Sequence, residues 1–171
     1  MHSSPVSRRW ISLSSAAVAF AIALPVSALA PTDQYAKYSN DTLTISDLHT
    51  GLEWDRHPNL NTQSSTIDYP PAVNFDAAVK QCRDDGKRLP SLKELLTIVD
   101  EAPYSKYVVT KNEPRYLDQN AFDNTPNGGF WTSSLVPNGN SAYTVDFFTG
   151  FVGTGTTTGG TPDSRYVRCV K

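Results

Sequence analysis

Residues 74–99, NFDAAVKQCRDDGKRLPSLKELLTIV, decide the fold of this chain because they predict two helices joined by a short link. The first helix is predicted to begin after Asn74, whose side chain suits the N-cap position, and to end at Gly86. Its buried face is an apolar stripe at helical spacing, which comprises Phe75, Ala78, Val79 and Cys82. Cys82 is therefore expected to face the core.

The second helix is predicted to begin after Ser91. Residues 91–94, Ser-Leu-Lys-Glu, match a capping box, in which the serine and the glutamate satisfy each other's backbone N–H groups. Its buried face is expected to comprise Leu92, Leu95, Leu96 and Val99. The link before it, Arg88-Leu89-Pro90, is predicted to be extended and to set the angle at which this helix starts.

Short strands are predicted on both sides of the helices. Alternating apolar and polar side chains indicate strands over residues 41–46, 52–54, 130–134 and 142–148, with residues 151–152 continuing the sheet. Residues 55–73, 102–128 and the Gly/Thr stretch 153–161 are predicted to be loops, and residues 165–171 a closing strand. Two helices early and strands at both ends predict an α+β domain, with two helices packed on short antiparallel strands and long loops.

The N-terminus has the pattern of a secretory signal over residues 1–30. Arg8 and Arg9 precede an apolar run over residues 10–24, and small residues around Ala28 and Ala30 offer two cleavage sites. The run is shorter than the roughly 20 residues of a membrane span, so no stable anchor is expected after cleavage. The arginine pair faintly resembles a twin-arginine export signal, although an ordinary Sec signal is favoured. We therefore expect an exported protein, periplasmic or extracellular, with a polar lead-in over residues 31–42.

The charge of the chain argues against nucleic acid as a partner. The sequence contains 15 basic and 17 acidic residues, and removal of Arg8 and Arg9 with the signal leaves 13 against 17, a net charge of −4. Affinity for nucleic acid comes mainly from neutralising phosphates. The same balance weakens, without excluding, binding to sulfated glycans.

Two cysteines, Cys82 and Cys169, occur in the whole sequence. In an oxidising compartment an isolated pair most simply forms one disulfide. The alternatives are two free thiols or part of a metal site. A zinc site takes four ligands, and beyond the signal the chain adds only His49 and His57 to the cysteines, so no metal and no cofactor is expected.

Two groups of residues are candidates for ligand binding. Lys80, Arg83 and Lys87 come from the first helix or just after it and could contact a polyanion, although an ordinary solvated helix face with an Asp76–Lys80 pair is favoured. The second group consists of the aromatic residues Trp131, Phe148 and Phe151. Their simplest role is in the core, but a ring exposed beside the Gly/Thr stretch could stack on a sugar.

Glu53, Asp55 and His57 alternate along one strand and its continuation, a pattern that could place three metal ligands on one face. A solvated face is favoured instead, because Trp54 has the character of the buried residue of that strand and His57 precedes Pro58. No metal-binding role is therefore assigned to these three side chains.

The order of segments resembles the Lcl C-terminal domain family, a bacterial domain of unknown function that also caps collagen-like adhesins. The motifs that carry the resemblance are TGLEW (50–54), a helix with Cys82, RLPSLKEL (88–95), FWTSS (130–134), residues 142–150 and VRCVK (167–171). The match covers roughly residues 43–171. The collagen-like stalk that trimerises those adhesins is absent, so trimerisation is not carried over.

This family is similar to the formylglycine-generating sulfatase-modifying enzymes, and the resemblance implies their C-type-lectin-like fold. The oxidase pattern needs a second reactive cysteine five residues before the terminal one, and Ser164 stands there. Glu113-Pro114-Arg115 lacks the amide that follows the proline in the calcium site of C-type lectins, and there is no Trp-Asn-Asp motif. These departures remove the known catalytic and calcium-binding groups.

We therefore expect an exported, non-catalytic binding module whose ligand is an extracellular glycan or a polyanionic polysaccharide. One alternative is a structural or protein-interaction module of the cell envelope. A divergent formylglycine-oxidase-like enzyme is the least favoured alternative, since its thiol pair is missing.

Overall fold

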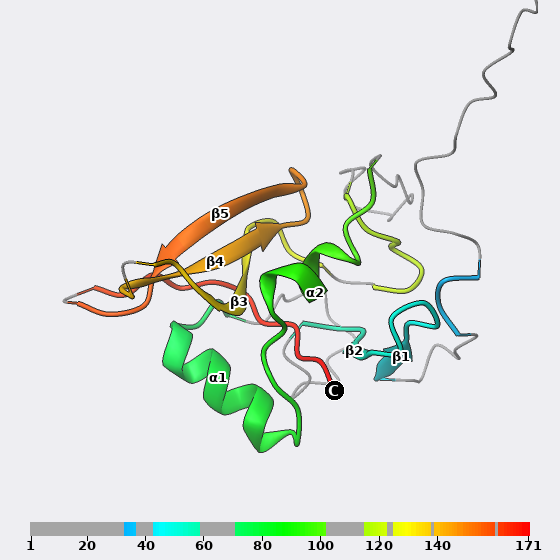
Figure 1. Ribbon diagram of the computed structural model, residues 1–171, viewed down its shortest axis with the longest axis horizontal. Helices are drawn as coiled ribbons and strands as arrows, with labels where there is room; N and C mark the ends of the chain where they lie inside the picture. Colours follow the sequence, from blue (N-terminus) through cyan, green and yellow to red (C-terminus); the bar gives the residue numbers. More distant parts are fainter. Residues whose placement is uncertain are drawn as a thin grey trace, which may run out of the picture.

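The structure is a computed structural model that describes residues 33–36, 43–58, 71–101, 115–122, 125–137, 139–159 and 161–171. The predicted signal over residues 1–30 and most of the lead-in lie outside this part. Within it, no helix is long and apolar enough to cross a membrane. The described chain contains two short helices and two antiparallel sheets, which confirms the predicted α+β class (Figure 1).

The first sheet is a hairpin of β1 (Thr44–Ser46) and β2 (Glu53–Asp55), in which Ile45 pairs with Trp54. Both side chains are buried because they share the inward face of the hairpin. Asp47 closes the turn: its Oδ1 accepts hydrogen bonds from the backbone N–H of His49 at 2.9 Å and of Thr50 at 3.2 Å. The predicted hairpin is confirmed: β1 ends at Ser46 as predicted but begins at Thr44, and β2 lies one residue later than predicted. Residues 41–42 of the first predicted strand lie outside the described residues.

The two helices begin where their caps predict. In α1 (Phe75–Asp84) the Asn74 side chain accepts a hydrogen bond from Ala77 N at 2.9 Å, and Gly86 follows the helix with φ of 68°. In α2 (Leu92–Leu96) Ser91 and Glu94 form the capping box. Both caps are confirmed.

The predicted buried faces need two corrections. Val79 and Leu96 are each 37% exposed, so neither belongs to the core. Val79 lies at the margin of the stripe that Ala78 and Cys82 bury, and α2 ends at Leu96 after five residues. Ile98, which follows α2, is buried instead.

The second sheet consists of β3 (Gly129–Leu135), β4 (Ser141–Asp146) and β5 (Phe151–Thr156), all antiparallel, with β4 in the centre. The expectation of a loop from Gly153 onward is wrong, because residues 153–156 pair with β4 as far as Ser141–Thr156. Glycine and threonine are typical of loops, but here the glycines occupy strand positions crowded by neighbouring side chains.

Apolar side chains on the two faces of this sheet enter two separate clusters. Phe130, Val145 and Phe147 pack with Trp54, α2 and the residues after it. Trp131 and Ala142 pack with α1 and the disulfide. Neighbouring residues such as Phe130 and Trp131 enter different clusters because strand side chains alternate between faces.

Residues 165–171 tie the domain together but do not form the continuous strand that was predicted. They make isolated bridges to four segments: Arg165 to Val73, Tyr166 to Phe130, and Val170 to both Trp54 and Arg88. Figure 1 shows this segment (red) running from the three-stranded sheet past α1 toward β2. The predicted disulfide is confirmed, since Cys169 is bonded to Cys82 of α1.

Arg168 anchors this segment from inside the core. Its side chain is fully buried, and Nη1 donates hydrogen bonds to the carbonyl oxygens of Asp55 at 2.5 Å and Arg56 at 2.7 Å. The guanidinium also lies 4.8 Å from the centre of the Phe122 ring. A buried cation is stable here because backbone carbonyls and an aromatic face replace its hydration.

Candidate functional site

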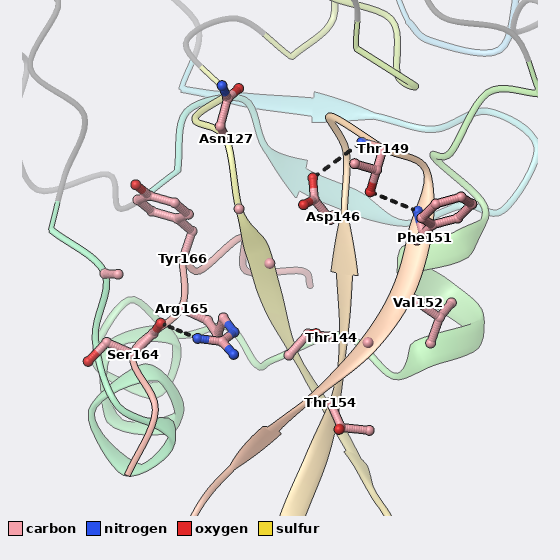
Figure 2. Close-up of a pocket in the computed structure, with 14 residues that line it drawn as sticks. Asn127, Thr144, Asp146, Thr149, Phe151, Val152, Thr154, Ser164, Arg165 and Tyr166 are labelled. Atoms are coloured by element: carbon pink, nitrogen blue, oxygen red, sulfur yellow. Dashed lines mark hydrogen bonds between the residues drawn. The ribbon is translucent and has the colours of Figure 1, made fainter. Parts of the chain in front are cut away.

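An open groove of about 510 Å³ lies on the face of the β3–β4–β5 sheet that also carries Trp131 and Ala142. Its lining comes from β3, β4, β5, the segment over residues 164–166 and a few flanking residues, among them Asn127. Figure 2 shows Arg165 and Tyr166 on one side, Phe151 on the other, and Thr144 between them. The groove is therefore an irregular trough across the sheet, with polar groups on its floor and rings at its sides.

The groove is hollow above Thr144 because the neighbouring residues on β3 and β5, Gly129 and Gly153, have no side chains. Thr144 on β4 pairs with Gly153 of β5, and a Cβ atom added to Gly153 would lie 3.1 Å from the Thr144 Oγ1. A Cβ atom added to Gly129 of β3 would lie 3.2 Å from the same oxygen. Glycine in a strand allows close approach of a ligand or another chain segment, and here it leaves room over a hydroxyl group.

Arg165 and Tyr166 form one wall. The Arg165 side chain lies over Gly129, and its guanidinium donates to Ser164 O at 2.9 Å and to Asp163 Oδ2 at 3.4 Å. The Tyr166 ring packs over Gly128 and against Phe130. The Arg165 side chain is 30% exposed and lines the groove, while Asp163 partly neutralises its charge.

Asp146 and Phe151 form the opposite end, where β4 turns into β5. Asp146 Oδ1 accepts hydrogen bonds from Phe148 N at 2.8 Å and from Thr149 N at 3.4 Å, which holds the turn (Figure 2 draws the second). Phe151 is paired with Asp146 across the strands and is 73% exposed. A carboxylate fixed by its own turn thus lies beside an exposed ring.

The structure does not assemble the predicted basic face. Lys80 is ion-paired with Asp84, four residues on, rather than with Asp76. Lys87 has turned inward and is ion-paired with Asp55, its side chain only 10% exposed. Arg83 is exposed. Of the three predicted cations, only Arg83 therefore has no ion-pair partner among the residues that the structure describes.

The three candidate aromatic residues take different positions. Trp131 has no exposed surface; it packs edge-on against Phe75 and donates its ring N–H to Val73 O at 2.8 Å, so it cannot stack on a ligand. Phe148 is half-buried, with the Arg115 guanidinium 5.2 Å from its ring centre. Of the three, Phe151 alone lines the groove.

The expectation of a solvated Asp55 is wrong. Its carboxylate is buried, where it pairs with Lys87 and accepts a hydrogen bond from Cys169 N at 3.2 Å. Burial raises the pKa of Asp55, and the Lys87 hydrogen bond opposes that rise. Among the described residues, no three histidine, cysteine or acidic side chains gather in a way that could hold a metal ion.

The groove could not be located from the sequence. Its polar members, Asn127, Thr144, Asp146 and Arg165, come from separate segments that only the sheet register and the terminal segment bring together. The one signal in the sequence is the glycine content of β5, a feature that predicts a loop when the sequence is considered alone. Ser164, the residue at the position of the missing oxidase cysteine, also lines the groove.

A family model described as the Lcl C-terminal domain matches residues 43–171 of the chain. Neither a curated protein nor a solved structure matches it.

Proposed function

This chain belongs to the Lcl C-terminal domain family, and from that premise we propose that it is an exported, non-catalytic module that binds a neutral glycan in the groove of the β3–β4–β5 sheet. The observation that carries the proposal is the composition of this groove. Hydroxyl, carboxylate, amide and guanidinium groups line it, together with the rings of Tyr166 and the exposed Phe151.

Sugar rings present hydroxyl groups at their rims and C–H groups on their faces. Fixed polar side chains suit the hydroxyls, and aromatic faces suit the C–H groups. Thr144 can both donate and accept, Asp146 accepts, and Arg165 donates. The turn holds Asp146 and the ion pair with Asp163 restrains Arg165, so little side-chain entropy is lost when they bind a ligand.

The charges favour a neutral glycan over a polyanion. Asp146 lies in the groove and would repel a sulfate or carboxylate group, whereas Asp163 offsets the charge of Arg165. On α1 and after it, Asp84 and Asp55 neutralise two of the three cations that could have attracted a polyanion. A neutral ligand predicts binding that changes little with salt.

Two features support a non-catalytic role. Both cysteines are held in the disulfide, and Ser164 occupies the position where an oxidase needs its second thiol. Among the described lining residues Asp146 supplies the carboxylate, whereas glycoside hydrolysis ordinarily uses a pair. The groove thus offers groups for binding without an evident nucleophile or acid–base pair.

The proposed export and fold family have separate support. A buried disulfide suits an oxidising compartment, in agreement with the signal pattern of residues 1–30. The C-type-lectin-like fold is supported by the return of residues 165–171 to β2, which brings both ends of the domain together. There Lys171 N donates to Glu53 O at 2.9 Å, and Glu53 N donates to Lys171 O at 3.4 Å.

A glycan array tests the function, with neutral and sulfated polysaccharides, at two salt concentrations and with or without calcium. We expect neutral hits that persist at high salt. Thr144→Val removes the floor hydroxyl at constant shape and should weaken binding about tenfold, while Thr158→Val, on an exposed residue outside the groove lining, should not. Phe151→Ala should weaken it similarly, with little loss of stability because the ring is exposed.

Silence across a broad array would overturn the glycan proposal. The second candidate is then a protein-interaction module of the envelope, favoured by the exposed apolar side chains of Phe151 and Val152 on β5. Capture of an envelope protein by the wild type, and not by Phe151→Ala, would establish that alternative.

A further inference from the structure

The outer edge of β5 carries backbone groups that no described segment pairs with. Toward β4, Thr157 N donates to Asn140 O at 3.0 Å; away from β4, Thr156 N donates to Asp163 Oδ2 at 2.9 Å, and Asp163 N donates to Thr156 O at 3.0 Å. Backbone groups alternate in direction along an antiparallel strand. The N–H and C=O groups of Val152 and Thr154 therefore point outward as well.

Between Phe151 and Thr154, the described residues give this edge none of the usual protection against pairing. Exposed edge strands normally carry charged residues, proline or a bulge. Residues 151–156, FVGTGT, contain no charge and no proline, and their pairing with β4 is regular along its whole length. Phe151 and Val152 are also exposed, so the edge is apolar at one end.

We propose that a second copy of this chain binds the edge, with the two β5 strands antiparallel about a two-fold axis at Gly153. Val152 of each copy then lies opposite Thr154 of the other, and four backbone hydrogen bonds form from the outward groups. The two Gly153 residues form the non-hydrogen-bonded pair between them, where strands approach most closely and the absence of side chains removes any obstruction.

The residues of the strand fit an identical partner. Because the strand is uncharged, two copies meet without like-charge repulsion. Phe151 of one copy falls opposite Gly155 of the other, a position with no side chain, so the exposed ring gains a surface to cover. Asp163 occupies the edge at Thr156 and limits the pairing to these few residues.

The size of this contact predicts its strength. A pairing of a few residues buries far less than the roughly 1,000 Å² of a stable interface, so the dimer is weak and depends on concentration. The two-fold axis is perpendicular to the sheet, because antiparallel neighbours are related in that way. The six-stranded sheet that results therefore carries both grooves on the same face.

Sedimentation velocity on the whole chain, recovered oxidised after any N-terminal processing, tests the proposal between about 10 µM and about 1 mM. We expect the average mass to rise from monomer toward dimer over this range. Thr154→Lys places a charge on the exposed edge and should raise the dissociation constant at least about tenfold. Thr158→Lys adds the same charge on an exposed residue after the strand and should leave it unchanged.

Amide hydrogen exchange identifies the surface independently of the variants. In the wild type, protection of the Val152 and Thr154 amides should increase with protein concentration, while that of Thr50, in the turn of the other sheet, should not. A monomer at every concentration would overturn the proposal. So would equal weakening by the two lysine variants, or association without added protection at Val152 and Thr154.

Discussion

Breaking the Cys82–Cys169 disulfide should cost this domain a large part of its stability. The two residues are 87 positions apart, and both side chains are buried. In the chain-entropy description, opening a loop of this length stabilises the unfolded state by about 4.6 kcal/mol at 25 °C. Domains of this size are typically stable by about 5–15 kcal/mol, so the reduced protein should be marginal.

Urea unfolding followed by tryptophan fluorescence measures the effect, since Trp131 packs in the same cluster as the disulfide. With an m value of about 2 kcal/mol/M, the midpoint of the reduced protein should fall by about 2 M. The protein must be reduced while unfolded and then refolded, because the buried sulfur atoms are shielded from reductant.

The Cys82→Ala/Cys169→Ala variant is the matched control, because it lacks the bond and its midpoint should not respond to reductant. It should unfold near the midpoint of the reduced protein, or somewhat below it because two buried sulfur atoms are lost. A fall of less than about 0.5 M on reduction would refute the reasoning. The loop would then already be closed in the unfolded state by other contacts.

Three further perturbations test particular contacts. The hydrogen bond from Arg88, aided by the Ser91 N-cap, lowers the pKa of Glu94 to about 2. The resulting stabilisation is present above pH 4.5 and is lost as the pH falls from 4.5 toward 2. Glu94→Gln should therefore flatten the dependence of the free energy of unfolding on pH in this range. Gly155→Ala places a Cβ atom 2.5 Å from the buried Trp131 ring and should lower the free energy of unfolding by about 1–3 kcal/mol in a urea titration. Asn74→Ala removes the cap of α1 and should cost about 1 kcal/mol by the same measurement; no loss would mean that the cap hydrogen bond is replaced by water.

Much of the secondary structure could be predicted from local sequence patterns. Asn74 and the Ser91–Glu94 box mark helix starts through side-chain chemistry that acts over three residues, and the structure confirms both. The β1–β2 hairpin follows from alternation and a turn. The extent of β5 was missed because its glycines are required by Thr144 and the Trp131 ring, neighbours that lie on other strands.

The candidate site was beyond sequence reasoning for the same physical reason. Lys87 looked like a solvated cation, and only the fold reveals that Asp55, from a strand 32 residues earlier, is its partner. The core is the simplest role for Trp131 and the structure confirms it, but the neighbours that bury the ring, α1 and Gly155, lie far from it in sequence. Arg165 and Asp146 line the same groove only because the terminal segment returns to the sheet.

The bridges of Val170 to both Trp54 and Arg88 also bear on the order of events during synthesis. Neither core cluster is complete until residues 167–170 are present, since Val170 belongs to one and Val167 and Cys169 to the other. Contacts between residues this distant in sequence form late, because the loop between them must close first. We therefore expect that a nascent chain ending before residue 165 does not fold stably. Such a chain stays unfolded until the segment over residues 165–171, which locks the domain, has been synthesised.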